Sequence, residues 1–380
     1  MQLESIAYRS QSGWSAALPG ALDGPDTLVL VFGAPSFARE PAALQQLAAA
    51  FPRSLLLGCS TSGEIAGDQL EDESLSVAVA RFEHTRLQLV HTLAEPGTDS
   101  FDAGADLAAR LADRSLRAVF VLSDGLAVNG SRLAEGLSRH LGPDVVVTGA
   151  LAGDGSDFAR TWVLDRAQPQ ARRICALGLY GDRLRIGHGC DGGWHDFGPE
   201  RRITRADGNV LYELDGKPAL DLYKTYLGDR AAGLPGTALL FPLAVRPQAD
   251  SEPLVRTILG IDEARRAMTF AGDVPEGATA RLMRTSNDRL IDSASQAVAQ
   301  AARGIGAGDA PLVISVSCVG RRLVLGERTD EEAETVVDGS PARAGHVGFY
   351  SYGEISPAIG GSGASELHNQ TMTVTVLDEA

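Results

Sequence analysis

The stretch LLLGCSTSGEI, from Leu55 to Ile65, starts as an apolar run and ends in a polar turn bounded by glycines. An apolar run of this length before a turn is typical of a strand that is buried on both faces. The same succession recurs along the chain, in TLVLVFGA (27–34), RAVFVLSDGL (117–126), DVVVTGALAGDG (144–155), PLVISVSCVG (311–320) and HVGFYSYGEIS (346–356). It predicts buried strands with polar residues at their ends, where open α/β sheets bind ligands.

Helical spacing separates these strands over residues 40–51, 101–112, 129–141 and 286–303. Alternating stretches at 74–93, 172–190 and 256–270 are predicted to form hairpins. Hairpins within an α/β order indicate mixed sheets. We therefore predict an α/β fold of α+β character, in which two similar layered domains have mixed, hairpin-containing sheets covered by helices.

The two halves of the chain have a similar order of elements, which we interpret as a structural duplication. The glycine-rich stretch CDGGWHDFGPERR (190–202) lies between them. We predict two domains, 1–207 and 208–380. Two other glycine-rich segments, 304–308 and 360–365, lack the strand–GxGxxG–helix context of a dinucleotide site.

The 380 residues carry 34 Lys and Arg against 49 Asp and Glu, a formal charge of −15. This charge argues against a nucleic acid partner, which needs a basic face, and against docking on anionic lipid. No apolar run reaches the roughly 18 residues of a membrane helix, and the N-terminus lacks the pattern of a signal peptide. The four cysteines form no CxxC pair, so we expect free thiols in a cytoplasmic protein without membrane insertion.

The turn of the opening stretch carries five candidate ligand contacts: Cys59, Ser60, Thr61, Ser62 and Glu64. Backbone N–H groups between two glycines can form an anion-binding nest, and the short hydroxyls add donors. The same hydroxyls can instead bond the local backbone. The string GCSTSG lacks the G-x-S-x-G spacing of a nucleophile elbow. We predict a ligand-recognition loop, with plain turn structure or catalysis by Ser60 or Cys59 as the alternatives.

Further candidate contacts follow the later strands or precede the last one: Asp154, Cys318, Arg321, Tyr352, Glu354, His368 and Asn369. An arginine such as Arg321 can bind a ligand carboxylate bidentately. Asp154 or Glu354 would hold a ligand ammonium. Turn chemistry or ion pairs within the protein would explain the same residues without a ligand.

Six motifs occur in order along the chain: GCSTSGEI, GALAGDGSDFARTWV, GNVLYELDGKPALDLYKTYLG, SCVGRRLVLGER, GFYSYGEISP and LHNQTMTVTVL. Together they resemble the FIST family, with a FIST N-terminal domain over 1–207 and a FIST C-terminal domain over 208–380. The resemblance implies an intracellular signalling module that binds a small ligand, an amino acid or a similar metabolite, without catalytic turnover. No kinase, cyclase, methyl-accepting or F-box segment is apparent, so we expect a stand-alone bacterial sensor.

The resemblance maps the family's motif residues onto Cys59, Ser60, Thr61, Gly63, Glu64, Asp154, Cys318, Arg321, Tyr352, Glu354, His368 and Asn369. Some bacterial stand-alone members are similar to haem proteins that sense nitric oxide and act through a histidine kinase or a cyclic-di-GMP enzyme. Haem is therefore an alternative cofactor. His188 is then the first candidate iron ligand, followed by His195 and His368.

Three functions follow from these residues and the resemblance. The first is a sensor that binds a small molecule between the domains or at strand-end loops and signals through a partner protein. The second is a haem-based nitric oxide sensor. The third is a hydrolase-like enzyme that uses Ser60 or Cys59, which would need a base within hydrogen-bond reach.

Overall fold

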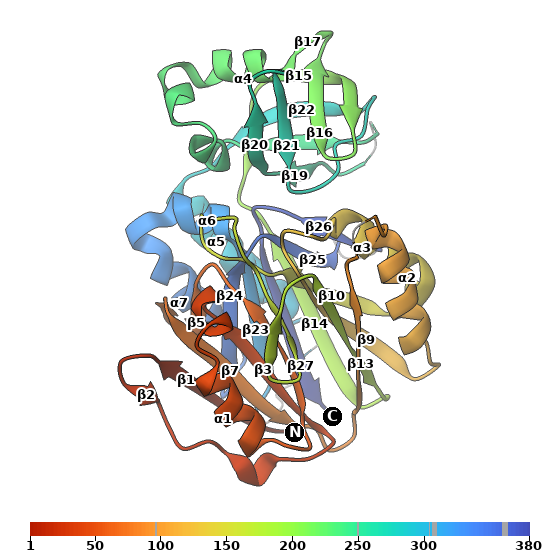
Figure 1. The fold of residues 1–380 in the computed structure, drawn as a ribbon, viewed down its shortest axis with the longest axis vertical. Helices are drawn as coiled ribbons and strands as arrows, with labels where there is room; N and C mark the ends of the chain where they lie inside the picture. Colours follow the sequence, from red (N-terminus) through yellow and green to blue (C-terminus); the bar gives the residue numbers. More distant parts are fainter. Residues whose placement is uncertain (96, 249–250, 304, 306–309, 359–363) are drawn as a thin grey trace.

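The computed structural model describes residues 1–95, 97–248, 251–303, 305, 310–358 and 364–380 (Figure 1). Within these residues the strands form three sheets in a large body and a fourth, the small sheet, in a separate unit beyond it. Both chain ends lie at the end of the body that is far from the small sheet. The glycine-rich segments at 304–308 and 360–365 fall largely outside the described residues.

The first sheet has the order β12 (Gln168–Gln170), β11 (Val163–Asp165), β4 (Leu55–Ser60), β3 (Thr27–Gly33), β7 (Ser74–Arg81), β1 (Gln2–Arg9) and β2 (Gly13–Trp14). The second sheet has the order β26 (Ser365–His368), β25 (Gly353–Pro357), β10 (Val146–Leu151), β9 (Leu116–Ser123), β13 (Arg173–Tyr180) and β8 (Arg86–Leu93). The third sheet has the order β14 (Leu184–Asp191), β27 (Met372–Glu379), β23 (Leu312–Cys318), β24 (Gly345–Ser351), β5 (Glu64–Ala66) and β6 (Gln69–Glu71).

One pattern of four strands recurs in these three sheets. A central strand pairs in parallel with the next strand along the chain, as β3 does with β4, β9 with β10 and β23 with β24. On its other side it pairs antiparallel with β7, β13 or β27, which in turn pairs antiparallel with β1, β8 or β14. The sequence predicts a duplication of two similar halves; the repeat that the structure shows is one sheet, and it occurs three times among the described residues.

Each of the three sheets is buried on both faces. Alternate residues of the central strands, such as Leu30, Phe120 and Ile314, point into one central core shared by all three sheets. The outer faces are covered by helices: α1 (Ala42–Ala50) on the first sheet, α2 (Ser100–Leu111) and α3 (Gly130–Leu141) on the second, α5 (Asn287–Ala301) and α7 (Thr329–Gly339) on the third. Burial on both faces explains why these strands are continuously apolar.

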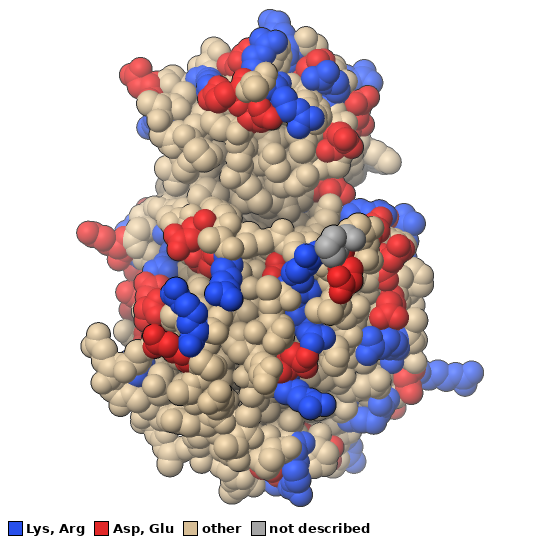
Figure 2. All heavy atoms as spheres, viewed as in Figure 1, with Lys and Arg blue, Asp and Glu red and all other residues tan. Residues whose placement is uncertain are grey.

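The small sheet is inserted between β14 and α5. Its order is β19 (Leu254–Arg256), β18 (Leu243–Arg246), β22 (Thr279–Arg284), β15 (His195–Asp207), β16 (Val210–Leu214), β21 (Ala267–Phe270) and β20 (Ile258–Asp262), and β17 (Lys217–Pro218) pairs with β16. It has its own apolar core, to which α4 (Ala219–Leu227) contributes. Figure 2 shows a constriction between this unit and the body, and acidic and basic side chains are interspersed over the visible face.

The remaining elements are short. Helix α6 (Val319–Leu325) directly follows β23. The described part of the chain also has 3-10 turns at η1 (Gly20–Leu22), η2 (Pro35–Ala38), η3 (Gly228–Gly233), η4 (Gly236–Leu240) and η5 (Gly326–Arg328). Of the helices that the described residues form, none combines the length and apolar character that a membrane crossing requires. The domain boundary predicted at residue 207 falls between β15 and β16, and it stays a prediction.

The predicted fold class, mixed α/β sheets covered by helices, is confirmed, but two predicted hairpins are wrong. In the stretch 74–93, β7 lies in the first sheet and β8 in the second; in 172–190, β13 lies in the second sheet and β14 in the third. Phe82, just after β7, and Leu184, just after β13, are buried in the central core between the sheets. The chain therefore passes through the core to another sheet and does not fold back beside the same strand. Alternation tells which face of a strand is buried, but it does not identify the neighbouring strand.

The packing of α2 against α3 depends on two glycines. A Cβ on Gly136 would lie 2.2 Å from the carbonyl oxygen of Phe101, and one on Gly104 would lie 2.5 Å from that of Leu133. We expect Gly136→Ala to destabilise the body by about 1–3 kcal/mol, which corresponds to about 2–4 °C of melting temperature per kcal/mol. Calorimetry would measure this shift.

Gly236→Ala is the matched control, because a Cβ there would meet nothing within 4 Å. Its melting temperature should stay close to that of the wild type. Equal melting temperatures for the two variants would contradict the close helix approach.

Candidate functional site

The carboxyl ends of β4, β10 and β24, one from each sheet, meet at one point. We call this point the three-sheet junction and include in it the turn 368–371 between β26 and β27. Backbone hydrogen bonds join the three strand ends pairwise: Gly153 N–H to Ser60 O at 3.0 Å, Ser62 N–H to Tyr350 O at 2.7 Å, and Tyr352 N–H to Leu151 O at 3.2 Å. Polar residues that lie far apart in the sequence are therefore neighbours here.

The structure places the predicted contact residues at or beside the three-sheet junction, and all of them are buried: Cys59, Ser60, Thr61, Ser62, Glu64, Asp154, Cys318, Arg321, Tyr352, Glu354, His368 and Asn369. Buried polar groups need hydrogen-bond partners. The partners of each group decide whether it is available to a ligand.

Asp154 is fully engaged within the protein. Its carboxylate accepts hydrogen bonds from the N–H groups of Ala159 at 2.8 Å and Arg160 at 2.6 Å, and from the hydroxyl of Tyr352. The Tyr352 ring stacks on Phe158 with 4.7 Å between centroids. In this arrangement Asp154 organises the loop after β10, and the expected ammonium contact would have to displace these bonds.

Arg321 is also fully engaged within the protein, so the expected clamp on a ligand carboxylate would have to displace its bonds. It is fully buried in α6, where Nε donates to Glu332 at 2.8 Å. Its terminal nitrogens donate to the carbonyl oxygens of Gly192 and Leu290, to the Ser293 hydroxyl and to Glu332. A buried ion pair whose remaining donors are satisfied is a structural element, because breaking it would leave an uncompensated charge. The sequence placed Arg321 at a strand end but could not show Glu332 opposite it.

Glu64 and Glu354 are carboxyls with raised pKa values. Burial raises the pKa of Glu64 to about 8, although hydrogen bonds from Thr61 and Ser74 oppose the shift. Burial likewise raises the pKa of Glu354 to about 7, against hydrogen bonds from Ser351 and Thr371. Both carboxyls are buried, and their pKa values lie much closer to neutral pH than that of an exposed glutamate.

The thiol and hydroxyl of the opening turn are poor nucleophiles in this environment. Burial raises the pKa of Cys59 well above its usual value, which keeps the thiol neutral. The Ser60 hydroxyl accepts the N–H of Trp162 at 3.0 Å. Among the described residues, no histidine or carboxylate is hydrogen-bonded to either group.

The three candidate haem ligands lie apart from one another. His188 is half-buried on β14 opposite Thr375, and burial lowers its pKa, so its imidazole is neutral. His195, at the start of β15, accepts a hydrogen bond from Arg284 at 3.0 Å. His368 is buried with its pKa lowered to about 4, and its Nε2 lies 3.2 Å from the Ser356 carbonyl. In the described residues, no cluster of three His, Cys, Asp or Glu side chains could hold a metal ion.

The turn 368–371 connects the three-sheet junction to the small sheet. Gln370 donates from Nε2 to the carbonyl of Leu239 in η4 at 2.9 Å, and Trp194 donates to the carbonyl of Gln370 at 2.9 Å. Neither atom of the fully buried Asn369 amide has a hydrogen-bond partner among the described residues. An unpaired buried amide is costly, so Asn369 marks a place for a water or a polar ligand group.

A pocket of about 320 Å³ lies beside this turn, between α3 and β26 of the body and β19 of the small sheet. We call it the interdomain pocket. It is lined by Ser131, Glu135, Ser138, Arg139, Arg256, Ala364, Ser365, Glu366 and Leu367. Leu367 directly precedes His368, so the pocket and the three-sheet junction share β26.

Arg256 is the most unusual residue of the interdomain pocket. Its side chain is only 4% exposed, and among the described residues no carboxylate lies within 4 Å of it. It donates to the carbonyl oxygens of Asp273 at 3.0 Å and Leu367 at 3.1 Å, whereas Nη2 has no described partner. Burial lowers the pKa of Arg256 to about 10, so it is charged at neutral pH.

Glu366 supplies the opposite charge in the same pocket. Burial raises the pKa of its carboxyl, and the field of Arg256 partly offsets the shift. Glu135 and Arg139, in contrast, form an ion pair with each other at 2.7 Å. Sequence reasoning missed both Arg256 and Glu366, because an arginine or glutamate in a short strand resembles an ordinary solvent-facing residue.

Glu64 makes the stability of the fold depend on pH. The folded protein keeps a proton that the unfolded chain releases above about pH 4.5, so the free energy of unfolding falls as pH rises towards the folded pKa of about 8. We expect Glu64→Gln to remove a slope of up to about 1.4 kcal/mol per pH unit over this range. Urea unfolding at fixed pH values measures it. The exposed Glu4→Gln should keep the wild-type slope, and an unaltered slope in Glu64→Gln would refute the assignment.

Comparisons with known proteins identify several that are similar to this chain. An uncharacterised protein of Mycobacterium tuberculosis, found in two strains, is 27% identical over 385 residues, which cover 95% of this chain and 90% of that protein. An uncharacterised protein of Methanocaldococcus jannaschii is 23% identical over 194 residues, which cover 47% of this chain and 36% of that protein. A solved structure described as cyanuric acid hydrolase, evolutionary innovation by structural concatenation, aligns with 9% identity over 100% of this chain and 99% of that chain, at a TM-score of 0.33.

The family models match most of the chain. The model of the FIST N domain matches residues 27–217, and that of the FIST C domain matches residues 219–357. The two models meet inside the small sheet, so strands of the body come from both. The resemblance of the six motifs is thus confirmed, and the chain belongs to the FIST family.

Proposed function

We propose that this chain is a sensor that binds a small zwitterion, such as an amino acid, in the interdomain pocket. FIST domains are sensor domains for small ligands in signal transduction. The pair Arg256 and Glu366 is the observation that indicates a zwitterionic ligand. Two opposite charges line one pocket, Arg256 buried and Glu366 half-buried, and neither has an ion-pair partner among the described residues.

A zwitterion would satisfy both charges at once. Its carboxylate would accept hydrogen bonds from Arg256 Nη2, and its ammonium would approach Glu366. The hydroxyls of Ser131, Ser138 and Ser365 line the same space and would fix its orientation. The pocket volume of about 320 Å³ lies within the usual range for small ligands, roughly 300–1,000 Å³.

The position of the interdomain pocket suggests how ligand binding would change the structure. Arg256 belongs to the small sheet, whereas Glu366 belongs to the second sheet, so a ligand held by both would fix the small sheet against the body. Asn129 also bridges the two units through Asp273, at 2.8 Å. We infer that the bound and free states differ in this placement, as in domain closure around a ligand. A histidine kinase or a cyclic-di-GMP enzyme stays the predicted partner class.

The residues of the three-sheet junction would then transmit the effect of ligand binding from the interdomain pocket to the rest of the body. β26 leads from Glu366 to Asn369, whose amide is unpaired, and Gln370 contacts the small sheet. Direct ligand contact by the earlier candidates, from Cys59 to Asn369, stays a prediction. Binding without turnover is favoured because Cys59 is a neutral buried thiol and Ser60 already accepts a backbone N–H.

Haem with His188 is the second candidate function, and it is favoured by the neutral, half-buried imidazole. Bound haem would supply an iron atom that nitric oxide can ligate. Protein purified from haem-supplemented cells should then show a Soret band that His188→Ala abolishes and His195→Ala retains. A featureless visible spectrum would rule this candidate out.

The zwitterion proposal predicts a ligand-dependent melting temperature. Each of the twenty amino acids would be added singly, and one that binds at a hundred times its Kd should stabilise the fold by about 2.7 kcal/mol. Arg256→Gln and Glu366→Gln should each abolish this shift. The amide and the α-hydroxy acid of the responding amino acid, which lack one charge each, should bind at least tenfold more weakly.

Arg139→Gln is the matched control, because Arg139 lines the same pocket but is exposed and paired with Glu135. Its ligand shift should stay within a degree or so of the wild-type shift. If Arg256→Gln does not fold, Glu366→Gln alone still tests whether the ligand shift depends on the pocket charges. A wild-type protein that responds to no amino acid, or a shift that survives both Gln variants, would overturn the proposal.

A further inference from the structure

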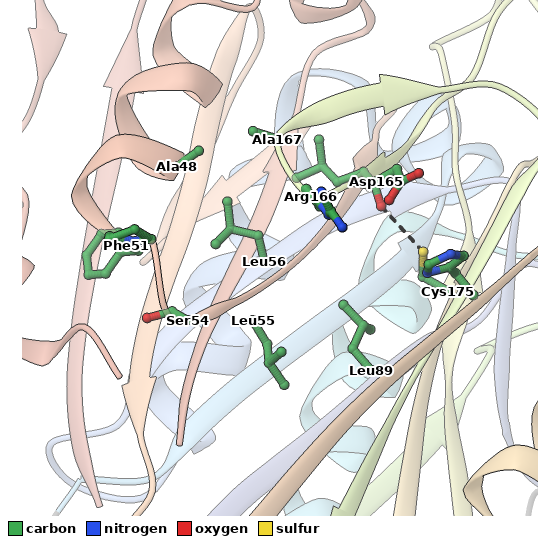
Figure 3. A pocket seen from close by; sticks show the side chains of 13 residues that line it. Ala48, Phe51, Ser54, Leu55, Leu56, Leu89, Asp165, Arg166, Ala167 and Cys175 are labelled. Carbon is green, nitrogen blue, oxygen red and sulfur yellow. Dashed lines mark hydrogen bonds between the residues drawn. The ribbon is translucent and has the colours of Figure 1, made fainter. Parts of the chain in front are cut away.

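A second pocket, of about 390 Å³, opens between the first and second sheets, far from the interdomain pocket in the sequence and in the fold. We call it the seam slot. Figure 3 shows Leu55, Leu56 and Leu89 around the opening, with Phe51 and Ala48 of the α1 region on one side and Cys175 on the other. Its walls are mainly apolar, and its charged side chains, Asp165 and Arg166, lie together near Cys175 (Figure 3).

The slot exists because the first sheet is incomplete at this place. β11 pairs with β4 at a single position, Val163 opposite Cys59, and then turns away into its hairpin with β12. Among the described residues, the first half of β4 therefore has no strand on that side. Leu55 is left partly covered, next to Leu89 of the edge strand β8, so apolar surface faces the opening.

The charges at the rim favour an anion. Asp165 is neutralised by its ion pair with Arg173. Arg166, the next residue, is exposed, reaches over the slot and has no ion pair among the described residues. His91 lines the slot from the opposite sheet. One guanidinium therefore stands free at the edge of an apolar space.

The Cys175 thiol, a further polar group of the slot, is unreactive. Burial raises the pKa of the Cys175 thiol to about 12, and the thiol lies 3.4 Å from the carbonyl oxygen of Leu164, to which it donates. A neutral, bonded thiol neither attacks a ligand nor repels its apolar part. The slot is thus built for binding and not for covalent chemistry.

We propose that the seam slot binds a small carboxylate with an unbranched apolar tail. The tail would lie between Leu55, Leu56 and Leu89, and the carboxylate would pair with Arg166. This site is independent of the interdomain pocket, and the ligand is of a different class from a polar zwitterion. Affinity should rise about fourfold for each methylene that enters the slot.

Isothermal titration of the full chain with hexanoate, octanoate and 1-octanol tests the proposal. Octanoate should bind more tightly than hexanoate and at least tenfold more tightly than 1-octanol, which lacks the charge. Arg166→Gln should reduce octanoate affinity about tenfold and leave 1-octanol affinity within twofold. Leu89→Trp, or Ala48→Phe on the opposite wall, should block both probes by filling the slot.

Arg343→Gln is the matched control, because Arg343 also lies in an exposed turn with positive φ, as Arg166 does. It should bind octanoate like the wild type. No octanoate binding at millimolar concentration, or binding that neither slot-filling variant weakens, would overturn the proposal.

Discussion

The inner faces of three sheets pack against one another in a single apolar core, and this contact sets the position of everything else. Leu30, Phe120 and Ile314 reach the core from three sheets with the same strand pattern. Because the sheets share a core and a pattern, the carboxyl ends of β4, β10 and β24 converge at one point. Apolar burial therefore brings these strand ends together, and backbone hydrogen bonds join them pairwise at the three-sheet junction.

Burial then determines what the polar groups can do. Inside the three-sheet junction a charge must be compensated by the protein itself, as Glu332 compensates Arg321 and as the loop after β10 compensates Asp154. Arg256 and Glu366 are an exception, since they line an open pocket where the small sheet meets the body. A ligand that completes such a pair gains charge-assisted hydrogen bonds without displacing existing ones. That difference favours the interdomain pocket over the closed junction.

Both pockets lie where two different sheets meet. The interdomain pocket lies between β19 and β26, which belong to different sheets, and the seam slot lies beside the uncovered half of β4. Close packing leaves few such spaces inside a single layer. The proposed zwitterion and the proposed carboxylate would therefore occupy two separate sites, the first between the small sheet and the body and the second within the body.

The sequence by itself determined the strands, their burial and the family, because a continuous apolar run such as 27–34 or 311–320 can be satisfied only between two covered faces. It also identified residues that meet at the three-sheet junction, since polar side chains directly follow those runs. It did not determine strand partners, so residues 74–93 and 172–190 were predicted as hairpins although Phe82 and Leu184 lead the chain across the core. The sequence also did not show whether a charged side chain has an ion-pair partner. Only the tertiary structure placed Glu332 against Arg321 and left Arg256 without an ion pair among the described residues, because that outcome depends on groups distant in sequence.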